Sequence, residues 1–331
     1  MIKKLIKLIL PNSLLKNILG IYSRLNTFRQ YIYDLKVYQQ FNGAKSKNNT
    51  SQLEGKIIAH YHVLEKGLSH PTPKNCFSLP VVKGLIKLIH QYDALTRIRS
   101  RQVDVAVEVL KQYLTFPTNQ SCITVNLIAS ISSLRCISKF NSGSYEFTRS
   151  EFFKNSEANF GDFALSRYSV RDFTDEDVSV DLLKEVVKIA QKTPSVCNRQ
   201  TAKVHLLINK KDIKNHLALQ NGNRGFGYKI NKLLIVSSDL YFFEGSRERN
   251  QAFVDGGMFA MSILYALHYH KIGAVALNWA YDNKQDKALH DLGRVPENEK
   301  IILFIGVGYP PDNFKVAVSD RRSLNEVMSI Q

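Results

Sequence analysis

Residues 166–173 read Ser-Arg-Tyr-Ser-Val-Arg-Asp-Phe, and this stretch decides how the rest of the chain is interpreted. Side chains alternate between two faces of an extended segment, so Arg167, Ser169 and Arg171 would point the same way. Guanidinium groups bind phosphate through paired hydrogen bonds, and a serine hydroxyl adds a neutral donor. The spacing therefore predicts a phosphate site, and the alternative is a surface ion-pair segment that includes Asp172.

A second polar cluster follows at residues 193–200, which read Thr-Pro-Ser-Val-Cys-Asn-Arg-Gln. An asparagine side chain offers both a donor and an acceptor, the combination that reads the edge of a heteroaromatic ring. The alternative is a capped helix end followed by a turn, which Pro194 and Asn198 also favour. The density of polar residues here strengthens the ligand-binding interpretation of the first cluster.

The chain around these clusters, residues 160–331, alternates helical patterns with short apolar runs. Helices are expected over residues 180–192, after the N-cap Ser179, and over 250–270, where low polarity all round indicates burial. Strand-length apolar runs occupy residues 204–208, 232–237, 273–279 and 301–306. This pattern predicts an α+β domain.

Residues 1–159 instead show helical spacing interrupted by polar breaks. Helices are expected over residues 14–25 with a looser continuation to 41, and over 52–66, 81–95, 102–114 and 122–137. A loop is expected at 42–51, a linker at 141–144, and Gly67 should end its helix in the left-handed conformation. The sequence thus predicts a basic, mostly helical region over 1–159 and a second domain over 160–331.

The composition of the chain argues against several classes of protein. The 331 residues are 44% hydrophobic, which argues against long disorder, and no run of about 18 uncharged apolar residues predicts a membrane-spanning helix. The four cysteines form no C-x-x-C pair, so a zinc ribbon or a dense disulfide framework is not expected, and a reducing, cytoplasmic location is the simpler interpretation. A peripheral position at the membrane surface is the alternative.

The net charge of +16 is concentrated in residues 1–159, which hold 22 Lys and Arg against 9 Asp and Glu. Such an excess indicates an anionic partner or a solvated basic face. The basic, apolar residues 1–10 could form an interfacial helix, so residues 1–41 are candidates for contact with an anionic membrane surface or another polyanion. Nucleic acid is not expected, because no groove-reading motif is present.

Three further groups of residues are candidates for sites. His60, His62 and His70 with Glu65 predict no metal site, because His60 and His62 do not share a helix face. The glycines of residues 222–227 do not have dinucleotide-motif spacing and favour a flexible turn, with Arg224 as a contact to an anionic substrate or a nicotinamide phosphate. Cys197 has no visible partner base, so it is not expected to be a nucleophile.

The order of four motifs over roughly residues 160–325 resembles the flavin-dependent nitroreductase family. The motifs are R-Y-S-V-R at 167–171, P-S-x-x-N-R-Q at 194–200, the apolar helix with D-G-G at 255–257 that ends at K-I-G-A, 271–274, and G-V-G-Y-P at 306–310. H-x-x-E-K-G-L at 62–68 and Q-N-G-N-R-G-F at 220–226 are similar to a subgroup of bacterial nitroreductase-like proteins from polysaccharide loci. The resemblance implies a three-layer fold, with a central mixed sheet flanked by helices.

The resemblance also implies FMN at the interface of a homodimer. Arg167, Ser169 and Arg171 would contact the phosphate and ribityl chain, Pro194 and Ser195 would line the ring, and Asn198 would hydrogen-bond the isoalloxazine. Backbone groups of Ala276, Leu277 and Asn278 would approach the reactive nitrogen, and Arg321 or Arg322 would complete the phosphate site. Thr201, where the family often has proline, and Met261, where glutamine is common, are departures that affect the substrate pocket.

The function implied is that of an FMN-dependent oxidoreductase. It would pass electrons from NADH or NADPH through the flavin to a small organic acceptor, nitro-like or quinone-like, with no side-chain acid or base nominated. One alternative is a polyanion-binding or membrane-surface protein with a vestigial flavin site. Another is a flavin enzyme that uses dioxygen or another reductant in a biosynthetic step.

Overall fold

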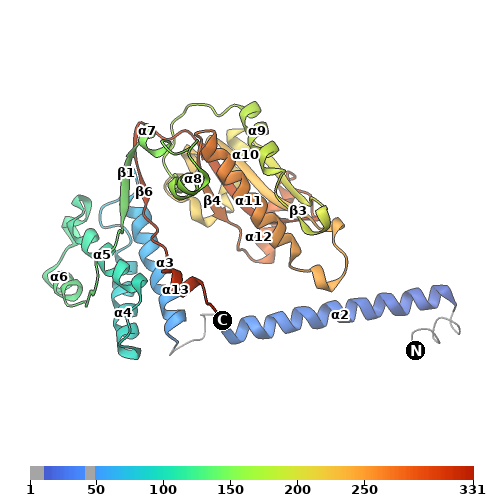
Figure 1. Ribbon diagram of the computed structural model, residues 1–331, viewed down its shortest axis with the longest axis horizontal. Helices are drawn as coiled ribbons and strands as arrows, with labels where there is room; N and C mark the ends of the chain where they lie inside the picture. The colour runs from blue at the N-terminus through green and yellow to red at the C-terminus, as the bar shows by residue number, and fades with distance from the viewer. Residues whose placement is uncertain (1–10, 42–48) are drawn as a thin grey trace.

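The computed structural model describes residues 11–41 and 49–331 (Figure 1). The predictions for residues 1–10, and for 42–48 of the expected loop, lie outside the described residues. The helices are α2 (Asn12–Phe41), α3 (Thr50–Leu68), α4 (Leu79–Leu95), α5 (Arg101–Thr115), α6 (Val125–Ser132), α7 (Arg149–Phe152), α8 (Phe160–Ser166), α9 (Val180–Ala190), α10 (Lys210–Ala218), α11 (Gln251–Tyr269), α12 (Asn283–Asp291) and α13 (Leu324–Val327). The strands are β1 (Ser144–Thr148), β2 (Ala202–Leu207), β3 (Lys232–Asp239), β4 (Gly273–Asn278), β5 (Glu299–Gly308) and β6 (Asn313–Ala317).

The N-terminal region has its own core, in which α3 packs against α4 and α5. Ile57, Leu64, Leu85 and Leu110 are fully buried there, at the helical spacing that the sequence predicted. Helix α6 is shorter than the expected 122–137, because Thr124 caps its first turn and residues 117–122 form a separate 3₁₀ helix.

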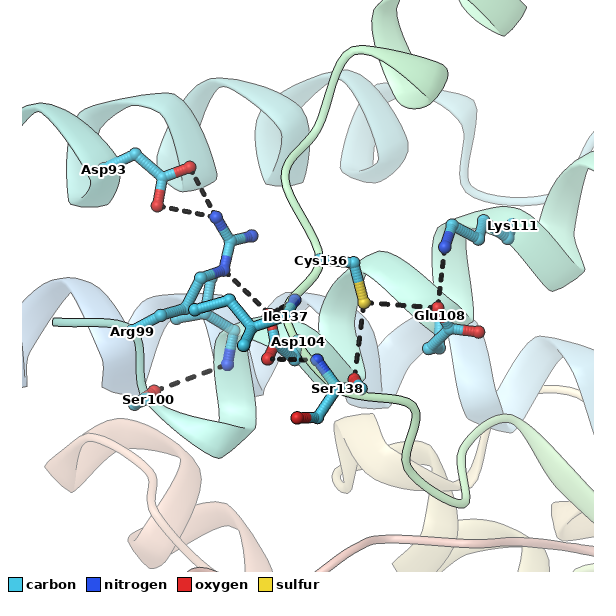
Figure 2. A network of polar contacts seen from close by, with 10 residues as sticks. Asp93, Arg99, Ser100, Asp104, Glu108, Lys111, Cys136, Ile137 and Ser138 are labelled. Carbon is cyan, nitrogen blue, oxygen red and sulfur yellow. Dashed lines mark hydrogen bonds and ion pairs between the residues drawn. The ribbon is translucent and has the colours of Figure 1, made fainter. Parts of the chain in front are cut away.

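A partly buried polar network fixes the turn between α4 and α5 (Figure 2). The Arg99 guanidinium donates twice to Asp93, at 2.7 and 2.8 Å, and its Nε lies 2.9 Å from a carboxylate oxygen of Asp104. Asp104 also accepts from the backbone N–H groups of Ile137 and Ser138. The network therefore joins α4, α5 and the segment that follows α6 into one unit.

A disulfide joins Cys76 to Cys122. It connects the loop between α3 and α4 to the 3₁₀ helix after α5. The cysteine spacing, which predicts no dense disulfide framework and favours a reducing location, did not predict this bond. The loop at residues 69–78 is thereby fixed to the N-terminal core.

Helix α2 extends away from the two cores and is largely exposed (Figure 1). It contacts the turn at residues 246–249, just before α11, where Asp34 pairs with Arg249 at 2.6 Å and Asn26 donates to the Ser246 hydroxyl. Its exposed apolar side chains are Leu14, Ile18, Leu19, Ile21, Tyr22, Leu25, Phe28, Tyr31, Tyr33, Leu35, Val37, Tyr38 and Phe41. No helix within residues 11–41 and 49–331 has the length and apolar character needed to cross a membrane.

The second core surrounds a four-stranded sheet of order β2-β3-β5-β4. On β3, Leu234 and Val236 pack with α9 and α11, whereas Leu233 and Ile235 pack with α10 and α12 on the opposite face. This alternation produces three layers, and the α+β prediction is confirmed. The sheet was expected to be mixed, but its pairings among the described strands are antiparallel.

A two-stranded antiparallel sheet of β1 and β6 lies between the two cores. Helix α3 packs against β6, and Phe152 and Phe153, just after β1, belong to the second core. The sequence predicted neither strand. The division into residues 1–159 and 160–331 stays a prediction, and this small sheet is where the two parts join.

The expected strands and the long apolar helix are confirmed to within a few residues. The prediction that Gly67 ends its helix in the left-handed conformation is wrong, because α3 continues to Leu68 and Gly67 does not have a positive φ. A Cβ at Gly67 would lie 2.1 Å from the Phe77 ring. Glycine is therefore needed at this position for close packing of the 69–78 loop and not for a helix cap.

Candidate functional site

A cavity of about 390 Å³ contains most of the predicted phosphate site. Arg167, Ser169 and Arg171 line it together with Ala276 and Arg321. The segment that carries the first three is extended beside β4, because the Val170 N–H donates to the Ala274 carbonyl oxygen at 2.9 Å. Val170 and Asp172 are buried, so the alternation expected from the sequence places the three polar side chains on one face.

The three arginines of this cavity form no ion pair with a carboxylate of the described residues. Within the described chain, Arg167, Arg171 and Arg321 form none of the ion pairs, and the hydrogen bonds of Arg171 and Arg321 go to the Ser169 and Ser319 carbonyl oxygens. Asp172 pairs with Lys229 at 2.6 Å, so the surface ion-pair alternative is not formed through these arginines. Asp320 also lines the cavity, but Arg101 binds both of its carboxylate oxygens.

The pKa values indicate how crowded these positive charges are. Burial lowers the pKa of Arg167, and the nearby charge of Arg321 lowers it further. Burial lowers the pKa of Arg171 to about 10, an effect that the buried Glu65 partly offsets. Both guanidiniums remain charged at neutral pH, so the cavity is a desolvated cationic site that an anion would stabilise.

The two C-terminal arginines have different surroundings. Arg321 lines the cavity, whereas Arg322 donates to the buried Glu54 at 2.9 Å and lies 4.0 Å from Glu326. Arg322 therefore joins the C-terminal segment to α3. The geometry favours Arg321 as the phosphate contact.

The predicted backbone contacts lie on β4, at the same edge of the domain. Ala276 is exposed and lines the cavity, Leu277 is buried in the core, and Asn278 is exposed. The Asn278 carbonyl oxygen accepts from the Gln220 side chain at 3.1 Å. This bond connects the end of β4 to the turn that contains Arg224.

The second motif lies elsewhere on the chain. Pro194 and Ser195 line a different cavity of about 150 Å³, which shares no lining residue with the arginine cavity, and Asn198 is exposed outside both. The buried Asp255 of α11 accepts from the Val196 N–H at 3.2 Å and fixes the loop. Left-handed backbone at Cys197, Asn198 and Gln200 makes the turn tight, and such strain is often found at functional sites.

The N-terminal region contributes residues that the site predictions missed. Tyr61 and His62 of α3 line the arginine cavity, and Ser319 joins them from the C-terminal segment. His62 lies 3.3 Å from the buried Glu65, which also accepts from the Ser319 N–H. The signal in the sequence is the H-x-x-E-K-G-L motif, which was interpreted above as a subgroup marker and rejected as a metal site.

Arg224 lines a third cavity, of about 590 Å³, which meets the arginine cavity at Arg171. The described residues contain no group of three or more His, Cys, Asp or Glu side chains arranged to hold a metal ion. The candidate site is a pair of basic cavities that share Arg171 and are lined by residues of both parts of the chain.

Known proteins resemble part of the chain. Residues 164–309 match the model of the nitroreductase family. The iodotyrosine deiodinase of Hydra vulgaris is 26% identical over 196 residues, which are 50% of this chain and 72% of that protein.

Similar solved structures include an FMN-dependent nitroreductase from Clostridium difficile R20291, with a TM-score of 0.43, 20% identity, and coverage of 51% of this chain and 96% of that one. Another is a nitroreductase family protein from Clostridium difficile 630, with a TM-score of 0.43, 19% identity, and coverage of 52% and 97%. The matched residues contain the R-Y-S-V-R and P-S-x-x-N-R-Q motifs in the predicted order. Residues 164–309 thus form a domain of the nitroreductase family.

Proposed function

We propose that this protein is an FMN-dependent oxidoreductase, which passes electrons from NADH or NADPH to a small organic acceptor. The observation that carries the proposal is the cluster of Arg167, Arg171 and Arg321 beside Ser169. The first two arginines are desolvated, and none of the three forms an ion pair with a carboxylate of the described residues. These donors fit a phosphate monoester, because guanidinium groups bind phosphate oxygens through paired hydrogen bonds. FMN, when bound, would supply the redox chemistry at its ring.

We propose further that two copies of the chain complete each site. Pro194, Ser195 and Asn198, the expected ring contacts, do not line the arginine cavity of the same chain. Helix α11 exposes Phe253, Val254 and Met258, an apolar surface that a second copy would cover. Under this arrangement one protomer binds the phosphate and the other contacts the ring.

In this proposal the side chains of the protein hold the bound groups and the surrounding loops in place, and no side chain is required to transfer a proton. Arg171 stands at the junction of the two cavities, where its charge would stabilise negative charge on a bound group. Asp255 fixes the loop that carries Asn198, so this asparagine is held by backbone geometry before any ligand binds. Glu65 and His62 hold Ser319, and thereby the C-terminal segment, against α3.

Helix α2 supports the oligomer more than the membrane-surface alternative. An interfacial helix needs one apolar face and one charged face. Over its whole length α2 exposes apolar side chains all around its axis, as the positions of Ile18, Leu19, Leu35 and Phe41 show. Such a helix is better suited to pack against another protein surface, and a second copy is the simplest candidate.

The proposal is tested by isolating the protein with its cofactor. We expect about one FMN per chain, released by denaturation and identified by mass, with affinity reduced at least about tenfold in Arg167→Glu and Arg171→Glu. Lys214→Glu is the matched control, because Lys214 is exposed on α10 and lines none of these cavities. Protein that stays colourless after incubation with excess FMN would refute the proposal, as would unchanged FMN titrations of both arginine variants.

A further inference from the structure

The largest of the three cavities has walls from both parts of the chain. One wall is the end of α3 and the 69–78 loop, and the other is the turn at residues 221–228. Only the second wall lies within residues 164–309, the part that matches the family model. The N-terminal region therefore builds half of this cavity.

The cavity is strongly basic. Lys66, Lys74, Arg171 and Arg224 line it, no Asp or Glu does, and none of the four forms an ion pair within the described chain. Burial lowers the pKa of Lys66, and the adjacent Arg171 lowers it further. These cations disfavour one another at close range, so a bound anion would relieve the repulsion.

The same cavity has an apolar part. Phe77 and Phe226 belong to the two cores and line opposite walls, and Tyr228 is exposed beside them. Aromatic walls combined with a few charged groups are typical of sites for small organic molecules, and a volume of 590 Å³ is within their usual range. The lining therefore suits a molecule with a flat apolar body and an anionic group.

The 69–78 wall is held in place by two connections. The Cys76–Cys122 disulfide fixes it to the N-terminal core, and the His70 Nε2 donates to the Gly225 carbonyl oxygen of the opposite wall at 3.0 Å. A wall fixed at both ends gives a preformed site, which lowers the entropy lost on binding.

We propose that this cavity binds the electron acceptor, and that the acceptor is an organic anion, a carboxylate or phosphate on an aromatic or similarly flat body. The proposal rests on the oxidoreductase function proposed above, because Arg171 also lines the cavity assigned to FMN. The N-terminal region then serves as a specificity element. Lys74 and Arg224, which line this cavity and not the one assigned to FMN, are the anion contacts.

Calorimetric binding of 4-nitrobenzoate to the full-length protein, compared with the neutral 4-nitrobenzamide, tests this. Lys74→Ala and Arg224→Ala should each weaken 4-nitrobenzoate binding about tenfold and change 4-nitrobenzamide binding less than about twofold. FMN content, measured by absorbance, should stay at the wild-type value. Lys214→Ala is the matched control, since it removes an exposed lysine remote from the cavity lining.

The outcomes separate the two proposals. Loss of FMN in the Arg224 or Lys74 variant would assign the cavity to the flavin, and equal weakening of the neutral ligand would remove the anion preference; either result overturns the inference. A third outcome is that the variants lose a preference for NADP⁺ over NAD⁺ while 4-nitrobenzoate binding is unchanged. That result would assign the anion site to the nicotinamide donor and would also overturn the inference. Selective anion binding by a protein that never takes FMN would support the site and refute the proposed function.

Discussion

His70 and Gly225, 155 positions apart in the sequence, form a hydrogen bond that joins the N-terminal region to the family domain. The His70 Nδ1 accepts from the Thr72 N–H at 3.0 Å, so Nε2 carries the proton that goes to the Gly225 carbonyl oxygen. Gly225 has a φ of +89°, and a Cβ there would lie 2.5 Å from the His70 Nε2. The contact therefore requires glycine at position 225 for two reasons, its backbone conformation and its lack of a side chain.

Gly225→Ala should break this connection. The left-handed conformation costs an alanine roughly 1–2 kcal/mol, and displacement of His70 adds to that. We expect a lower melting temperature and weaker 4-nitrobenzoate binding, with FMN content unchanged, measured by thermal unfolding and calorimetry. Gly245→Ala is the matched control, because Gly245 also has a positive φ but a Cβ added there would have no neighbour within 4 Å. Equal effects of the two variants on ligand binding would mean that the His70 contact does not shape the cavity.

Arg321 and Arg322 should differ in what they support. Arg321→Ala should reduce FMN affinity about tenfold with little change in unfolding, because it removes a cavity donor. Arg322→Ala should keep FMN but destabilise the fold, because it leaves the buried Glu54 carboxylate without its guanidinium. Equilibrium FMN titration and thermal unfolding of both variants check this. The reverse pattern would show that the phosphate contact has been assigned to the wrong residue.

The buried His268 should make the fold sensitive to mild acid. Burial, with a smaller contribution from Arg167, lowers the pKa of His268 from 6.5 to about 4. The unfolded chain therefore takes up a proton near pH 6.5 while the folded chain stays neutral down to about pH 4, so stability falls as the pH falls through that window. Above pH 6.5 this residue should have no effect on the pH dependence.

The variant His268→Gln isolates this contribution. Glutamine can still hydrogen-bond the Ser166 hydroxyl, which now lies 2.8 Å from the His268 Nε2, but it does not titrate. Urea midpoints at pH 8 and pH 5 should differ less in the variant than in the wild type. An identical pH dependence in both proteins would show that other groups, such as carboxylates, account for all of it.

Local pattern was sufficient to predict the elements of the family domain. The short apolar runs of β2, β3 and β5, and the largely apolar α11, are signals that lie within a few neighbouring positions. Strands β1 and β6 were missed because each is short and finds its partner across most of the domain, as in the pairing of Tyr145 with Val316. Local hydrophobic periodicity does not predict pairing between strands so far apart in the sequence.

In the candidate site, too, the residues placed by local sequence were predicted and those placed by tertiary packing were missed. Arg167, Ser169 and Arg171 were predicted because three alternating positions suffice to place them on one face. Tyr61 and His62 were missed because they reach the cavity only after α3 packs on β6, which is a tertiary event. Gly67 was assigned the wrong role for a related reason, since the Phe77 ring that requires it comes from the next loop.

The last prediction concerns how two copies share one site. If Arg167 of one protomer and Asn198 of the other serve the same flavin, chains with complementary defects should rebuild a complete site in a mixed dimer. Arg167→Glu alone should lose FMN, and Asn198→Ala alone should keep FMN but be reduced slowly by the nicotinamide, because its phosphate donors are intact. Mixed dimers, isolated through two different affinity tags, should hold about one FMN per dimer.

The rate of reduction of that single flavin distinguishes the two arrangements. In a shared site, the FMN held by the Asn198→Ala chain would contact Asn198 of the Arg167→Glu chain, so stopped-flow reduction should proceed at the wild-type rate. If each chain builds its whole site alone, that FMN would meet only the alanine, and reduction should stay as slow as in the Asn198→Ala homodimer. Cys197→Ala in place of Asn198→Ala should leave reduction within about a factor of two in every combination, because the exposed Cys197 is assigned no contact to the ring.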